Sequence, residues 1–175
     1  MSLIRGLSFF GLCFAFVVIA LGAWTRLVDA GLGCPDWPGC YGFVVFPTTE
    51  AEILIAEQRY PQFPYEIDKA IPEVVHRYFA AALGFIAILL VAFSFKHKLP
   101  TRIKAIASLL LFFICCQGLF GYLTVSLKLL PIIVTGHLFG GFITLSLFFY
   151  LFLNTSDGIK NHQIGHLKIL GGIAL

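Results

Sequence analysis

Long apolar stretches separated by short polar ones make up most of the chain. Four of them approach the roughly 20 residues that a helix needs to cross a bilayer core, and they cover residues 6–24, 72–95, 105–127 and 132–153. The pattern predicts an all-α membrane protein in which residues 1–153 form an antiparallel bundle of four transmembrane helices. Residues 154–175 are expected to form a cytoplasmic linker and the start of a fifth helix.

The composition agrees with a lipid environment. Hydrophobic residues make up 59% of the chain and charged residues 12%, about half the roughly one-quarter that soluble domains carry. The net charge of +3 is small and no basic tract is present. We therefore expect membrane lipid around the helices and no nucleic-acid partner.

The positions of the charges predict the orientation. Basic residues occur at Arg5, in the short loop 96–104, and at Lys160 and Lys168, whereas the long loop 25–71 holds seven acidic and three basic residues. Because lysine and arginine are retained on the cytoplasmic side, the N terminus is expected in the cytoplasm and loop 25–71 outside, in a bacterial-type inner membrane. A cleaved signal peptide over the first stretch is the alternative.

Loop 25–71 contains two cysteines close together. Cys34 and Cys40 enclose five residues that include Pro35, Pro38 and Gly39, which favour a tight reversal. A disulfide would persist in an oxidising compartment and would remove about 2–2.5 kcal/mol of unfolded-loop entropy. The alternative is that both cysteines are free thiols. A zinc site is poorly supported, because the loop offers no third and fourth ligand nearby. The other cysteines lie in apolar stretches and are expected to act as inert small hydrophobes: Cys13, Cys115 and Cys116.

A short surface helix is expected further along the same loop. In "TTEAEILIAEQRY", Thr49 is followed three residues later by Glu52, the pattern of a capping box. A loop of this length is more than a connector, so a lid or binding role is expected.

The second apolar stretch begins with the polar segment "IPEVVHRY". Pro72 suits the first position of a helix, and Glu73 in the first turn would complement the helix dipole. His76 and Arg77 lie one helical turn deeper, so the preferences of a helix start do not explain these two residues. Glu73 and His76 are spaced i, i+3 and are expected to share a face.

The fourth apolar stretch contains a second histidine in "PIIVTGHLFGG". The second and fourth stretches run in the same direction, so His76 and His137 are expected at nearly matching depths in the outer leaflet. Small or polar residues are expected to line this region: Ala80, Gly84, Gln117, Gly121, Thr124, Gly136, Gly140 and Gly141.

Ionisable residues inside a membrane are functional candidates. A pair of axial histidine ligands to a haem, held between two helices of a bundle, fits His76 and His137. The alternative is that each histidine hydrogen-bonds to a neighbouring helix. Iron or copper without a porphyrin is less favoured, because only Glu73 lies near enough to be a third ligand. Solvated positions in cytoplasmic loops are expected for His97, His162 and His166.

Three segments together resemble the haem A synthase family, membrane enzymes of cytochrome oxidase assembly. They are "TRLVDAGLGCPDWPGCYG" at 25–42, "EVVHR" at 73–77 and "QGLFGYLTVSLKLLPIIVTGHL" at 117–138. The resemblance implies oxidation of a methyl group of haem O to a formyl group, which gives haem A, with haem b as the cofactor. It also implies haem O synthase and cytochrome oxidase assembly factors as partners.

The resemblance assigns roles to individual residues. His76 and His137 match the pair associated with the substrate haem, Glu73 matches the acid of the E-x-x-H-R motif, and Cys34 and Cys40 match the outer-loop pair. As the catalytic residue, Glu73 would accept a proton or offset positive charge. A second binding residue is Arg77, which would pair with a haem propionate.

Family members consist of two similar four-helix halves, so the resemblance implies half of an eight-helix pseudo-twofold protein. This chain ends at Leu175, before a second histidine pair, and is expected to be an amino-terminal fragment or to pair with another subunit.

Two other functions would use the same pair of histidine ligands. A b-type di-haem electron-transfer subunit needs no acid beside them, and a haem chaperone performs no chemistry.

Overall fold

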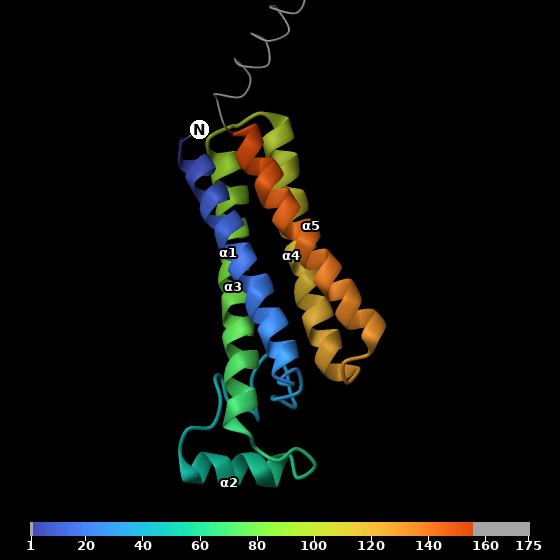
Figure 1. Cartoon of the computed structure of the whole chain (residues 1–175). Helices are drawn as coiled ribbons and strands as arrows, with labels where there is room; N and C mark the ends of the chain where they lie inside the picture. The colour runs from blue at the N-terminus through green and yellow to red at the C-terminus, as the bar shows by residue number, and fades with distance from the viewer. Residues whose placement is uncertain (1, 156–175) are drawn as a thin grey trace, which may run out of the picture.

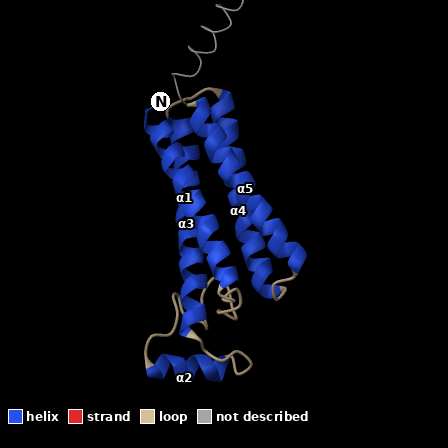
Figure 2. Cartoon of the chain, in the orientation of Figure 1, coloured by secondary structure: helices blue, strands red, loops and turns tan. Residues whose placement is uncertain are grey.

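The computed structural model describes residues 2–155, which contain five helices and no named β-strand. The expected linker and fifth helix, with His162 and His166, lie outside the described residues. The helices are α1 Ser2–Leu27, α2 Glu50–Arg59, α3 Ile67–Lys96, α4 Thr101–Ser126 and α5 Pro131–Asn154. Figure 2 shows that loops connect them.

Four helices form the predicted bundle. Helices α1, α3, α4 and α5 are each long and apolar enough to cross a membrane, and successive ones run in opposite directions (Figure 1). Helices α1 and α4 each pack against both α3 and α5, so α3 and α5 lie diagonally across the bundle. The prediction of an all-α, four-helix membrane bundle is confirmed.

The hydrophobic core lies at the end of the bundle farthest from α2. It is built from the first part of α1, the last part of α3, the first part of α4 and the last part of α5. Phe148 is fully buried there, against a glycine of α1. A Cβ atom at Gly11 would lie 2.2 Å from the Phe148 ring, so only glycine allows this packing. Toward α2, the pair α1 and α3 diverges from the pair α4 and α5 (Figure 1).

Helix α3 begins earlier than the sequence pattern indicated. It starts at Ile67 and contains Pro72 in its interior, so Pro72 is not the first helical residue and Glu73 lies beyond the first turn. The proline has no N–H to donate. The carbonyl that lacks this helical hydrogen bond is that of Asp68, an exposed residue near the start of the helix. The Pro72 carbonyl accepts a hydrogen bond from the Thr25 hydroxyl at 3.2 Å. Charge–dipole stabilisation at a helix end therefore does not account for Glu73.

Residues 28–66 connect α1 to α3 and form a small folded unit around α2. The capping box of Thr49 and Glu52 is present, as predicted. The unit has its own apolar cluster, in which Tyr41 is 2% exposed and packs against two other tyrosine rings. The Tyr41 hydroxyl donates to the Pro64 carbonyl at 3.0 Å. Burial raises the pKa of Tyr41 to about 12.

Candidate functional site

Two histidines meet inside the bundle. His76 comes from α3 and His137 from α5, and their ring centroids lie 6.3 Å apart with the ring planes at 87°. The two helices are diagonal in the bundle, and bundles commonly build cofactor sites from side chains on facing helices. The matching depth predicted from the sequence is consistent with this contact.

The histidine pair lacks hydrogen-bond partners on one side of each ring. The Nδ1 atoms of His76 and His137 are buried, and the structure gives neither a partner. Buried polar atoms are normally hydrogen-bonded, and an exception calls for an explanation. The alternative in which each histidine hydrogen-bonds to a neighbouring helix holds for His76, which has a hydrogen bond to the Val18 backbone of α1, but neither Nδ1 atom takes part in such a bond.

The spacing of the rings suits ligation of one metal ion from two sides. A metal–imidazole bond of about 2.0–2.1 Å would place two such rings roughly 6 Å apart between centroids. Within residues 2–155, no group of three or more His, Cys, Asp or Glu side chains could hold an ion. The donor set therefore fits an iron that brings its own macrocycle better than an ion held by protein ligands alone.

Glycines surround the two rings. A Cβ atom at Gly22 of α1 would lie 2.9 Å from Cε1 of His76, and one at Gly121 of α4 would lie 3.9 Å from Cε1 of His137. On α5, the backbone at Gly140 is in close contact with the Gln117 side chain, and a Cβ atom there would lie 1.8 Å from Nε2. These positions let the helices approach the imidazoles and the Gln117 amide closely.

Glu73 and Arg77 bind the cysteine loop. The Glu73 carboxylate is 5% exposed, and its Oε2 accepts a hydrogen bond from the Cys34 N–H at 2.9 Å. Its Oε1 pairs with the Arg77 guanidinium. Arg77 also donates to the carbonyls of Asp36 at 3.0 Å and of Gly39. The residues that flank His76 on α3 thus tie this helix to the loop.

Sequence reasoning missed this role. It gave Glu73 and Arg77 roles beside the haem and did not predict their contacts with the loop, although their i, i+4 spacing is a signal for a mutual ion pair. Their partners in the loop are backbone groups, and the pattern of side chains along the sequence does not predict contacts with backbone groups.

The loop itself is closed and reaches across the bundle. Cys34 and Cys40 form a disulfide with a Cα–Cα distance of 4.8 Å. Trp37, between them, lies with its ring centroid 6.0 Å from that of Tyr122 on α4. The loop therefore connects the α1–α3 side to the C-terminal end of α4.

The remaining candidates lie away from this site. His97 follows the last residue of α3 and is exposed. The free thiols of the described chain belong to Cys13 and Cys115, which are exposed, and to Cys116, which is half-buried.

Fold and site together define a helical membrane protein whose four-helix bundle contains a buried histidine pair beneath a disulfide-closed loop. The family model described as cytochrome oxidase assembly protein matches residues 5–173, and the chain belongs to this family. It is 43% identical over 144 residues to a protein of Shewanella oneidensis named heme A synthase. That match covers 82% of this chain and 43% of the relative, so the chain spans less than half the length of the curated relative it matches. The family resemblance seen in the sequence is confirmed.

Proposed function

We propose that this chain is the haem O-binding half of a haem A synthase, which oxidises a methyl group of haem O to a formyl group through successive hydroxylations. The observation that carries the proposal is the contact between His76 and His137 across the bundle, with both Nδ1 atoms buried and unpartnered. Family membership and the named relative support the same reaction.

His76 and His137 are the proposed ligands of the substrate iron. Two axial protein ligands leave no open position for oxygen on that iron. The pair therefore serves to hold and orient the substrate, and the group that is altered lies at its periphery. The small residues around the rings, such as Gly22 and Gly121, let α1 and α4 approach the two imidazoles closely.

Glu73 is the proposed acid–base residue, one helical turn from His76. It would accept a proton from the periphery or offset positive charge that develops there. Its two oxygens have partners in this structure, the Cys34 N–H and Arg77. For Arg77 to bind a propionate, as the resemblance implies, a carboxylate would replace one of the loop carbonyls that it now contacts.

Haem b, the implied resident cofactor, is assigned to the longer protein. Of the three histidines among residues 2–155, His76 and His137 are already assigned and His97 is exposed. We therefore assign none of residues 2–155 to haem b. Contacts with haem O synthase and with oxidase assembly factors belong to the same proposal for the longer protein.

The orientation is also part of the proposal. Arg5 and loop 96–104 lie at one end of the bundle, and residues 28–66 lie at the other (Figure 1). By the positive-inside rule, the first end is cytoplasmic and the cysteine loop covers a site in the outer leaflet of a bacterial inner membrane.

The test uses the longer protein that contains this chain, expressed in membranes that supply haem O and make no haem A of their own. Haem extracted from these membranes is identified by mass. We expect haem A from the wild type and from the control His97→Ala, and none from His76→Ala or His137→Ala. With Glu73→Gln, haem O should be retained without conversion, which an electron-transfer subunit would not show. Haem A at the wild-type level in His76→Ala would contradict the proposal.

A further inference from the structure

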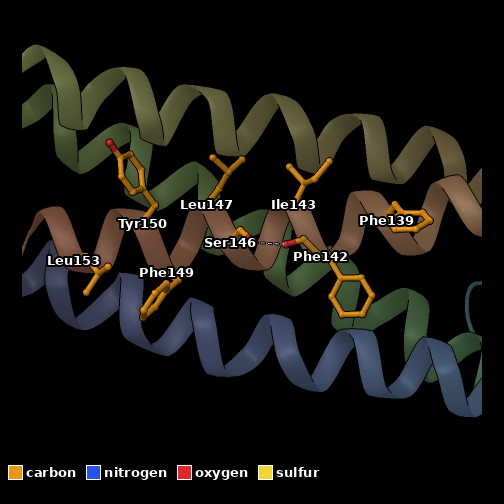
Figure 3. Close-up of a pocket in the computed structure, with 8 residues that line it drawn as sticks. All are labelled: Phe139, Phe142, Ile143, Ser146, Leu147, Phe149, Tyr150 and Leu153. Atoms are coloured by element: carbon orange, nitrogen blue, oxygen red, sulfur yellow. Dashed lines mark hydrogen bonds between the residues drawn. The ribbon is translucent and has the colours of Figure 1, made fainter.

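A groove of about 580 Å³ runs along the outward face of α5. It extends from Phe139 to Leu153 (Figure 3), a length of about 21 Å by the helical rise per residue. One leaflet of a bilayer core is roughly 15 Å thick. All eight lining residues belong to α5, so the groove is a shallow, open face of one helix. It is long enough for a hydrocarbon chain of one leaflet to lie along it.

The groove offers a hydrocarbon surface along its length. Of its eight lining residues, only Ser146 and Tyr150 carry polar side-chain atoms. The Ser146 hydroxyl donates to the Phe142 carbonyl at 2.8 Å (Figure 3), and the Tyr150 hydroxyl accepts from Arg102. Because both hydroxyls are already engaged, the middle of the groove suits an alkyl chain and not a polar ligand.

Two arginines flank the end of the groove. The Arg102 guanidinium, at the start of α4, lies 5.5 Å from the Tyr150 ring centroid. The Arg5 guanidinium, near the start of α1, lies 5.5 Å from the Phe152 ring centroid. Helices α1 and α4 are the two that pack against α5, so a guanidinium stands on each side of its last turn.

These arginines suit an anionic group. Within residues 2–155, neither Arg5 nor Arg102 forms a salt bridge with a carboxylate. Guanidinium groups recognise phosphate by paired hydrogen bonds. The basic loop 96–104 at the same end adds Lys96, Lys98 and Lys104.

We propose that this groove binds one anionic phospholipid from the leaflet at the basic end of the bundle. The phosphate lies at the basic end of the groove beside Arg102, which stands over the lining residue Tyr150. Arg5 and the lysines of loop 96–104 add positive charge around it, and one acyl chain follows α5 from Leu153 toward Phe139. The site faces away from the histidine pair and does not depend on haem, so it goes beyond the proposed function.

The test is native mass spectrometry of the purified 175-residue chain in detergent, after incubation with phosphatidylglycerol or with zwitterionic phosphatidylcholine. We expect preferential retention of phosphatidylglycerol. Arg5→Gln and Arg102→Gln should each lower this retention about fivefold, the factor that corresponds to roughly 1 kcal/mol per basic residue at an anionic surface. Lys128→Gln, at the opposite end, is the charge-matched control and should retain lipid normally.

Ser146→Trp tests the groove itself, because this outward position tolerates a larger side chain without entering the core. This variant should keep the helical content of the wild type by circular dichroism and lose the bound phosphatidylglycerol. Equal retention of the two lipids by the wild type, or full retention by Ser146→Trp, would overturn the proposal. A lipid-free dimer that Ser146→Trp converts to a monomer would also overturn it, and would assign the face to a second copy of the chain.

Discussion

Glu73→Gln should weaken the attachment of the cysteine loop to α3. The substitution preserves size and leaves an oxygen for the Cys34 N–H, but it removes the negative charge that strengthens this hydrogen bond and that positions Arg77 for its bonds to the loop carbonyls. Hydrogen bonds to charged groups contribute about 1.5–3 kcal/mol, and this pair is well shielded, with side chains only 6% and 13% exposed. We therefore expect the loop to lose about 2 kcal/mol of local stability, which corresponds to roughly 30-fold faster opening.

Hydrogen–deuterium exchange with mass spectrometry measures this opening directly. Peptides covering residues 33–42 should exchange roughly 30-fold faster in Glu73→Gln, while peptides from the core end of the bundle should be unchanged. Glu57→Gln is the matched control, because Glu57 is exposed on α2. Unchanged protection of residues 33–42 would refute the assigned tether, and equal loss of protection throughout the bundle would show a global effect instead.

Gly22→Ala should weaken haem binding by displacing His76, because the new Cβ would lie 2.9 Å from Cε1 of that ring. Gly6→Ala is the control, because nothing lies within 4 Å of a Cβ at that position. Titration with haem measures the affinity of both variants. The loop unit should lose stability as pH rises from about 10 toward 12, because Tyr41 holds its proton more tightly when folded; tyrosinate absorbance during alkaline unfolding checks this. A reporter fused after Phe95 should be active only in the cytoplasm, and periplasmic activity would reverse the proposed orientation.

The transmembrane helices could be predicted because their signal is local and long. Each apolar stretch approaches the length of a bilayer crossing, and the structure places a helix on each of them. The boundary of α3 could not be predicted in the same way. Residues 67–71 are mixed in polarity, and the proline at 72 suggested a helix start. The Pro72 carbonyl accepts a hydrogen bond from Thr25 of another helix, and a local sequence pattern cannot predict such a contact.

The candidate site was predictable only in part. The depth of His76 and His137 follows from counting residues along parallel helices, and this brought the two histidines together correctly. The partners of Glu73 did not follow from counting, because the Cys34 N–H lies 39 residues away along the chain. Hydrogen bonds from a side chain to distant backbone atoms depend on the path of the loop, which the sequence pattern does not determine.

The most direct test of the account is the spectrum of haem bound to this chain. Haem titrated into the purified chain should give a low-spin, bis-histidine spectrum by absorption and electron paramagnetic resonance. His76→Ala and His137→Ala should each abolish that low-spin signal, because one imidazole cannot fill both axial positions, while His97→Ala should leave it intact. An unchanged low-spin spectrum in either of the first two variants would contradict the assignment of this pair as the haem ligands.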